Sequence, residues 1–287
     1  MANALATVRP YIKASGSLDE QVSIDNQAIT ILADPSTKLT YSSPGVILTI
    51  TGTSTVSIFD LEIDDGLGAT GVGISMPTGN MSTVALERVK VDNCDGGGVV
   101  TDGGTLSIER STISGNTGGG ISISAGAFTL ENNFVVANGA ATSAFGGVKI
   151  DAITTTGTHQ FDFNTISANV GPATVDTGVL CGTVTVPLTL DSNIIYANSV
   201  SSGGHQLGGS TNCGAIYSDI GPDGSAGSGN INADPVFVST TESDYHLTSG
   251  SPCIDVADPA ATLDVDFDGD TRPQGSGRDI GADEYKP

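Results

Sequence analysis

The stretch LSIERSTISGN (106–116) is followed by FTLENNFVVAN (128–138), and the two share one pattern of apolar, polar and asparagine positions. Each has an apolar residue at its third and eighth positions and ends in asparagine. Alternation around the third position is typical of a short β-strand with one buried face. Four further copies of the pattern occur: VSIFDLEIDDG (56–66), VALERVKVDNC (84–94), HQFDFNTISAN (159–169) and LTLDSNIIYAN (188–198).

A second short strand, opening with glycine, is expected after each copy. Each repeat then holds two or three short strands, too few to bury an apolar face alone, whereas stacked repeats enclose a continuous core. Helical repeats are disfavoured, because glycine, serine, threonine and β-branched residues replace the helix formers. The expected second strands begin at Gly73-Ile74, Gly98-Val99, Gly120-Ile121, Gly147-Val148, Gly178-Val179 and Gly204-His205.

Asparagine at the end of the repeat indicates the type of stack. An asparagine at a corner can bond the local backbone and the asparagine of the next coil, which builds a ladder. This predicts an all-β fold, a right-handed single-stranded parallel β-helix, with residues 22–213 as coils. Residues 1–21 form an N-terminal segment, and 214–287 an irregular acidic region that packs on the helix end as a cap. The main column is Asn116, Asn138, Asn169 and Asn198, and a second column is Asn133, Asn164 and Asn193.

Charge and composition narrow the function. The 287 residues include 32 acidic and 10 basic side chains, a formal net charge of −22. A surface this acidic repels a phosphate backbone, which excludes a nucleic-acid binder. No window approaches the ~20 apolar residues of a membrane span, so we expect no membrane insertion by this segment. We expect a monomer.

The last 60 or so residues contain several short elements in a characteristic order: Asp234-Pro235, Tyr245-His246-Leu247, Ser251-Pro252, Asp268-Gly269, Arg272-Pro273 and Asp279-Ile280-Gly281. Together with the repeats, these elements make the chain similar to the pectate-lyase-like right-handed β-helix proteins of the bacterial choice-of-anchor Q family. The resemblance implies an extracellular or cell-surface protein whose export signal and anchor lie outside this sequence.

A candidate calcium site lies in the same region. Asp264, Asp266 and Asp268, followed by Gly269, have the spacing of the first half of a calcium loop, and Asp270 adds a fourth carboxylate. The closing glutamate of such a loop is missing. The alternative is a solvated loop in which Arg272 or Arg278 pairs with these carboxylates.

A second acidic cluster follows from the alignment of the repeats. Asp64 and Asp92 occupy one position in neighbouring coils, with Asp65, Asn93 and Asp95 beside them. Carboxylates at the strand spacing of about 5 Å repel unless water or a cation screens them. The cluster is therefore either a second cation site or a hydrated turn.

Candidates for catalysis are few. Many right-handed β-helices cleave acidic polysaccharides, and such an enzyme needs a base beside acidic residues. Lys149 next to Asp151 is the more isolated base, and the pair Asp64-Asp65 is a weak match to a hydrolase motif. The other bases of the coil body are Arg88, Lys90 and Arg110. Arg88 and Arg110 share a position beside an acidic column, which indicates an exterior ladder of weak ion pairs. That acidic column is Glu87, Glu109, Glu131 and Asp191.

The cysteines give one structural prediction. Cys181 and Cys213 lie 32 residues apart, about one coil, so a disulfide between them is plausible. Cys94 continues the asparagine column and is expected to be a buried thiol.

Two functions remain open. The first is a non-catalytic extracellular protein that binds a glycan or a protein partner, and the absence of tryptophan weighs against a sugar platform. The second is a calcium-dependent polysaccharide lyase or glycoside hydrolase. The sequence shows no recognisable set of catalytic residues, which favours the binding function.

Overall fold

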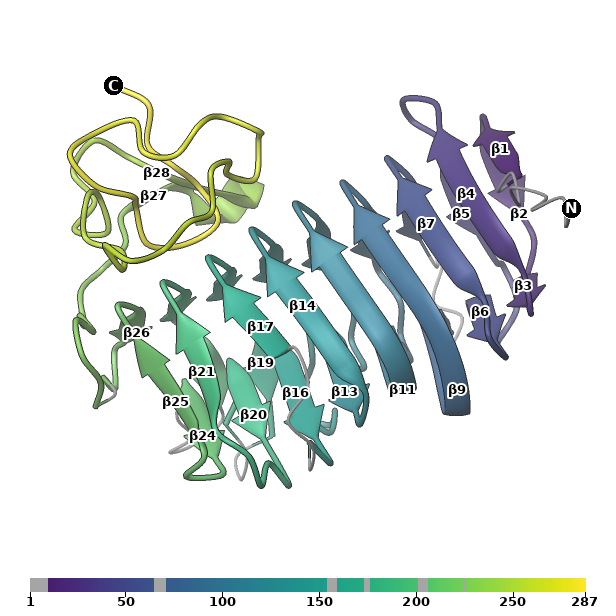
Figure 1. The fold of residues 1–287 in the computed structure, drawn as a ribbon, viewed down its shortest axis with the longest axis horizontal. Helices are drawn as coiled ribbons and strands as arrows, with labels where there is room; N and C mark the ends of the chain where they lie inside the picture. Colours follow the sequence, from purple (N-terminus) through teal and green to yellow (C-terminus); the bar gives the residue numbers. More distant parts are fainter. Residues whose placement is uncertain (1–9, 65–70, 154–158, 173–175, 201–205, 225) are drawn as a thin grey trace, which may run out of the picture.

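The computed structural model describes residues 10–64, 71–153, 159–172, 176–200, 206–224 and 226–287. The described chain is a right-handed parallel β-solenoid with one short 3₁₀ helix, η1 (Thr240–Glu242). Figure 1 shows the strands stacked along one axis, with the C-terminal region beside the later coils. Over these residues no helix has the length and apolar character that crossing a lipid bilayer requires.

Each coil contributes strands to three faces, numbered here in chain order. Face 1 consists of β3 (Val22–Asp25), β6 (Val46–Thr51), the first halves of β9 (Val72–Glu87) and β11 (Gly97–Glu109), β13 (Ile121–Ser124), β16 (Val148–Asp151), β20 (Val179–Cys181) and β24 (Leu207–Gly209).

Face 2 comprises β1 (Tyr11–Ala14), β4 (Ala28–Ala33), β7 (Thr55–Phe59), the second halves of β9 and β11, β14 (Ala127–Glu131), β17 (His159–Asp162), β21 (Leu188–Asp191) and β25 (Cys213–Ile216).

Face 3 comprises β2 (Ser17–Asp19), β5 (Lys38–Thr40), β8 (Glu62–Asp64), β10 (Lys90–Asp92), β12 (Thr112–Ser114), β15 (Phe134–Val136), β18 (Thr165–Ser167), β22 (Ile194–Tyr196) and β26 (Asp219–Gly221). Outside the faces, β19 (Val170–Gly171) pairs with β23 (Ser199–Val200), and β27 (Phe237–Ser239) pairs antiparallel with β28 (Asp244–Leu247).

The repeated pattern corresponds to one strand of face 2, a corner, and one strand of face 3. Its apolar positions stack in register: Ile108 pairs with Leu130 on face 2, and Ile113 with Val135 on face 3. All of these side chains are buried, as the alternation predicts, because inward-facing residues of successive coils contact each other. The buried set is Ile58, Leu86, Ile108, Leu130, Phe161 and Leu190 at the third position, and Ile63, Val91, Ile113, Val135, Ile166 and Ile195 at the eighth.

The asparagine ladder forms as predicted. Asn138 Nδ2 donates to Asn169 Oδ1 at 3.0 Å and to the carbonyl of Ile113 at 2.8 Å. The second column repeats this geometry, with Asn133 Nδ2 at 2.9 Å from Asn164 Oδ1. Each buried amide of the main column therefore satisfies backbone groups of the preceding coil and bonds the amide of the following one. Cys94 continues the main column, as expected, and is a buried thiol.

The stack extends beyond the predicted coil range of 22–213 at both ends. β1 and β2, inside the expected N-terminal segment, pair in parallel with β4 and β5. β25 and β26 continue faces 2 and 3 through Gly221. These coils could not be recognised in the sequence, because neither carries the full eleven-residue pattern. The predicted disulfide is present: Cys181 and Cys213 are joined with an S–S distance of 2.05 Å.

From β7 onward, the corner between faces 2 and 3 holds one left-handed residue per coil, with φ between 44° and 62°. We call this set the corner column. A left-handed residue turns the chain sharply between two strands. Phe163 of this set packs in a buried cluster with residues of the C-terminal region. The corner column consists of Asp60, Arg88, Arg110, Asn132, Phe163, Ser192 and Tyr217.

The C-terminal region was expected to pack on the helix end, and only its first part does so. Ile231 forms a bridge with Asp219 on the last coil. The rest turns back along the side of the solenoid and contacts the corner column (Figure 1). Arg110 Nε donates to the carbonyl of Phe267, and Asn132 Nδ2 to that of Val265.

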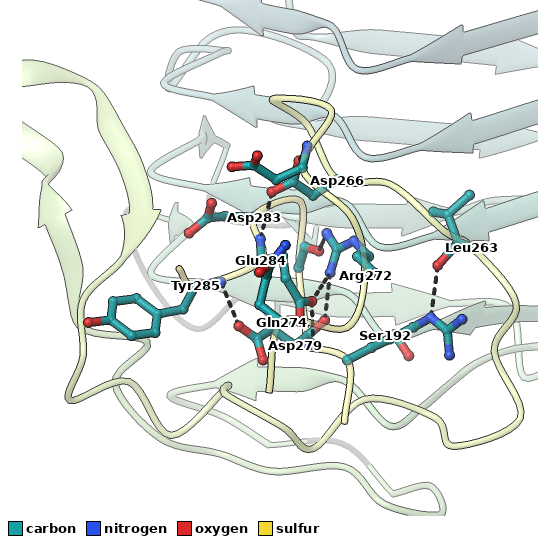
Figure 2. Close-up of polar contacts among 12 residues, drawn as sticks. Ser192, Leu263, Asp266, Arg272, Gln274, Asp279, Asp283, Glu284 and Tyr285 are labelled. Carbon is teal, nitrogen blue, oxygen red and sulfur yellow. Dashed lines mark hydrogen bonds and ion pairs between the residues drawn. The ribbon is translucent and has the colours of Figure 1, made fainter. Parts of the chain in front are cut away.

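Arg272 anchors this region on the corner column. Its guanidinium lies 4.7 Å from the centre of the Phe163 ring, and Nη2 donates to Asn132 Oδ1 at 3.2 Å. Nη1 pairs with Glu284, which also accepts the backbone N–H groups of Gln274 and Asp279 (Figure 2). The buried charge is thus paired and hydrogen-bonded on several sides, which a buried ion requires.

Candidate functional site

A groove forms where the C-terminal region leaves the outer side of face 3 uncovered. Its volume is about 460 Å³. β10, β12 and β15 supply the floor, and β28 with the loop at Phe267 supplies the opposite wall. The lining residues are Lys90, Asp92, Asn93, Thr112, Ser114, Gly115, Phe134, Val136, Ala137, Ser243, Tyr245, His246 and Phe267.

Aromatic rings gather at the junction of floor and wall. The ring centre of Phe134 lies 4.4 Å from that of Phe267, 5.3 Å from the imidazole of His246 and 6.4 Å from Tyr245. Phe134 and Tyr245 are buried, whereas Phe267 and His246 are half-buried and present part of their rings to the groove. The groove therefore combines an aromatic junction with hydroxyl and charged groups on the neighbouring strands.

The basic groups that line the groove are paired with carboxylates. Lys90 Nζ lies 2.7 Å from Asp92 and 3.4 Å from Glu62. Although burial opposes the charged form, these carboxylates raise the pKa of Lys90, so the ammonium stays protonated at neutral pH. A shallower hollow continues the groove past Lys90 to Arg88 and Arg110 of the corner column.

The exterior ladder at this corner is present in part. Arg88 Nε lies 2.7 Å from Asp60, and Arg88 also pairs with Glu87. Arg110 Nη1 is 3.7 Å from the same Glu87. These groups are partly exposed, so each pair contributes little to stability.

His246 lies among three carboxylates. Its Nδ1 is 2.6 Å from Asp244 Oδ1, and its Nε2 lies 3.1 Å from Asp268 Oδ2 without making a hydrogen bond. Burial opposes protonation, but Asp244, Asp283 and Asp268 together raise the pKa of His246. The sequence pattern predicted no functional role for His246, which belongs there only to the matching element Tyr245-His246-Leu247.

The candidate calcium loop does not bring its four carboxylates together. Asp264 pairs with Arg278, as the alternative to calcium proposed, and Asp270 with Lys286. Asp266 is buried and accepts the backbone N–H groups of residues 270 and 284. Asp268 faces His246. Within the described residues, the group of carboxylate and imidazole atoms close enough to share an ion is His246, Asp268 and Asp283. Calcium at the loop stays a prediction.

The aspartates of the second acidic cluster lie in register on neighbouring strands, and lysines lie beside them. Asp64 and Asp92 are partners in neighbouring strands of face 3. Lys38 lies 2.6 Å from Asp64, and Lys90 2.7 Å from Asp92, so lysines screen both carboxylates. The alignment missed Lys38 because its coil lacks the repeat pattern.

The predicted cluster also includes Asp95 and Asp65. Asp95 accepts a hydrogen bond from Thr117 Oγ1 at 2.7 Å, beside a turn. Asp65 lies outside the described residues. A cation at Asp64, Asp92 and Asp95 stays a prediction.

The catalytic candidates Lys149 and Asp151 lie on face 1, away from the groove on face 3. Lys149 Nζ is 3.6 Å from Asp151. The N–H groups of Thr183 and Ala152 donate to Asp151 and, with Lys149, lower its pKa although burial opposes this. Asp151 thus holds a turn of the next coil through its carboxylate.

The comparisons with known proteins concern the fold. No family model matches the chain, and no curated protein matches it. Among solved structures, the chain is similar to the crystal structure of the pectate lyase Pel9A, with a TM-score of 0.59 and 14% sequence identity over 98% of this chain and 90% of that one. This likeness establishes a pectate-lyase-like parallel β-helix. The choice-of-anchor Q family stays a prediction.

Proposed function

We propose that this protein binds a glycan, without cleaving it, in the groove between face 3 and the C-terminal region. The observation that carries the proposal is the junction of Phe134, Phe267 and His246 beside the polar side chains of Lys90, Asp92 and Thr112. Sugars present apolar C–H faces and hydroxyl edges, so a site for them combines rings with hydrogen-bonding groups. The chain has no tryptophan, and these aromatic side chains supply the apolar surface in its place.

Charge pairing supports binding rather than catalysis. A general base must have a pKa near the working pH and lie within reach of the proton that it removes. Lys90 is held in its protonated form by Asp92 and Glu62. His246 has a carboxylate beside each ring nitrogen, Asp244 at 2.6 Å and Asp268 at 3.1 Å.

We propose that the protein works outside the cell or at its surface. The disulfide between Cys181 and Cys213 supports this, because disulfides persist in oxidising compartments. The ligand is then a polysaccharide of a cell surface or of its surroundings, with a protein partner as the alternative.

A glycan microarray followed by titration calorimetry tests the proposal. Phe267→Ala should weaken binding of the best glycan by about tenfold or more, because it removes aromatic contact area. Thr112→Arg should weaken binding by filling the groove from its floor. Tyr11→Ala is the matched control, since this exposed aromatic residue lies on the first strand, away from the groove.

Unchanged binding in both groove variants, with intact unfolding transitions, would place the ligand elsewhere. An equal loss of binding in Tyr11→Ala would indicate nonspecific binding of the glycan to exposed aromatic rings.

The second candidate is calcium-dependent cleavage of an acidic polysaccharide, which the fold shared with a pectate lyase favours. Incubation with a polysaccharide panel, with calcium or with chelator, tests it through new reducing ends and unsaturated uronates. Calcium-dependent release would replace the binding proposal with an enzyme, and Lys149→Ala would then test the predicted base. Absence of release would leave binding as the proposed function.

A further inference from the structure

Three side chains of the C-terminal region converge beside the groove. His246 comes from β28, Asp268 from the loop after Phe267, and Asp283 from the segment near the C-terminus. One ligand atom of each lies within 4.8 Å of the other two. His246 Nε2 and Asp268 Oδ2 are 3.1 Å apart, close to the roughly 3 Å that separates neighbouring ligand atoms around an ion with bonds of about 2.0–2.2 Å.

The imidazole nitrogen that faces the two carboxylates is buried and has no hydrogen-bond partner. The other ring nitrogen is held by Asp244 at 2.6 Å, which fixes the plane of the ring. A carboxylate behind a histidine is the usual arrangement that orients a metal-binding imidazole. His246 is therefore positioned beside Asp268 and Asp283 with an Nε2 that makes no hydrogen bond.

The two carboxylates have complementary environments. Asp283 is buried, and its Oδ2 accepts the backbone N–H of Leu247 at 2.6 Å, which fixes its orientation. The Asp268 side chain is 52% exposed and provides a path from solvent. A rigid buried ligand next to an accessible one suits an ion that enters from the groove side.

We propose that His246, Asp268 and Asp283 form a binding site for a divalent transition metal ion, with Zn²⁺ as the probe. One imidazole nitrogen and two carboxylate oxygens match the mixed donors of such ions, whereas Ca²⁺ and Mg²⁺ prefer oxygen alone. Three protein ligands leave a coordination position open. That position lies beside the groove, because His246 lines the groove and Asp268 lines the hollow that continues it.

The site differs from the predicted calcium loop, with which it shares only Asp268. Asp264, Asp266 and Asp270 have other partners: Arg278, two backbone amides and Lys286. The alternative without a metal is a protonated His246 that pairs with the carboxylates around it. The two possibilities predict different responses to Zn²⁺.

Titration calorimetry of the tag-free full chain with ZnCl₂ tests the site. We expect one ion per chain, at least about tenfold weaker binding in Asp268→Asn, and unchanged binding in Asp264→Asn. Asp264 is the matched control, since it lies in the same loop with a side chain 87% exposed. Both substitutions remove one carboxylate from exposed positions, so folding should survive, and an unfolding curve verifies this.

Co²⁺ provides a spectroscopic readout that does not depend on glycan binding. Bound Co²⁺ should show visible absorption bands that His246→Gln abolishes, and excess Ca²⁺ should not displace the ion. Equal Zn²⁺ affinity in wild type and Asp268→Asn, an equal loss in Asp264→Asn, or displacement by Ca²⁺ would each overturn the proposal.

Discussion

Arg272 and Glu284 form an ion pair with Nη1 and Oε2 3.1 Å apart, and neither side chain is exposed to solvent. The pair joins two loops of the C-terminal region directly over the corner column. Burial lowers the pKa of Arg272, although Glu284 and other carboxylates oppose this. The groove and the proposed metal site both depend on this region staying in place.

Removal of the arginine tests its importance. Arg272→Ala leaves Glu284 buried without its partner, and we expect a loss of about 3–5 kcal/mol in the free energy of unfolding of the C-terminal region. Urea unfolding followed by Tyr fluorescence measures this. Lys286→Ala is the control, because Lys286 and its partner Asp270 are both partly exposed, and this substitution should cost little stability. Similar losses in both variants would contradict the anchoring role.

The asparagine ladder gives a second prediction. Asn138 accepts hydrogen bonds from the backbone N–H and the Nδ2 of Asn116, and donates to Ile113 and Asn169. Asn138→Leu or Asn169→Leu should destabilise the fold by roughly 1–3 kcal/mol, because buried polar groups lose their partners. Denaturant midpoints measure the effect, with the exposed Asn232→Leu as control. Unchanged midpoints in both ladder variants would contradict it.

The pH dependence of stability follows from three carboxylates in register on face 2. Burial, followed by mutual repulsion, raises the pKa of Glu131 to about 7, and burial raises that of Asp162 to about 6. Burial, together with Asp258 and Asp162, raises the pKa of Asp191 to about 7. These groups bind more protons in the folded state, so their contribution to stability is complete below about pH 4 and is lost as pH rises to about 7.

The melting temperature should therefore fall between about pH 4 and pH 7. Asp162→Asn should flatten this dependence, because it removes one titrating group and its repulsion of both neighbours. Asp25→Asn, exposed on β3, should leave the slope unchanged. A melting temperature that rises over this range would contradict the prediction.

The disulfide should stabilise the later coils. Cys213→Ser opens a crosslink between residues 32 apart in the sequence and should cost roughly 2–4 kcal/mol through the entropy of the unfolded chain. Thermal unfolding under non-reducing conditions measures this. Added reductant should lower the stability of the wild type but not that of Cys213→Ser, and equal sensitivity would contradict the assignment.

The sequence alone determined the coil architecture, because the residues that stabilise a coil recur at fixed positions along the chain. The six coils with the repeated pattern bury the same two apolar positions, and four of them end in the same asparagine, so the pattern predicted faces 2 and 3, the ladder and the pairing of Cys181 with Cys213. The first and last coils could not be predicted in this way, because β1, β2, β25 and β26 are held by strand pairing without the full pattern.

Only the tertiary structure decided where the C-terminal region lies and what it forms. Its contacts join residues far apart, such as Arg110 with Phe267 and Asn132 with Val265, and none of them repeats. Six residues of the corner column that receives it occupy the fifth position of the repeated pattern, but their side chains differ in chemistry, so the pattern does not show that another segment packs there. The groove and the convergence of His246 with Asp268 and Asp283 arise from this single packing event, which no periodicity encodes.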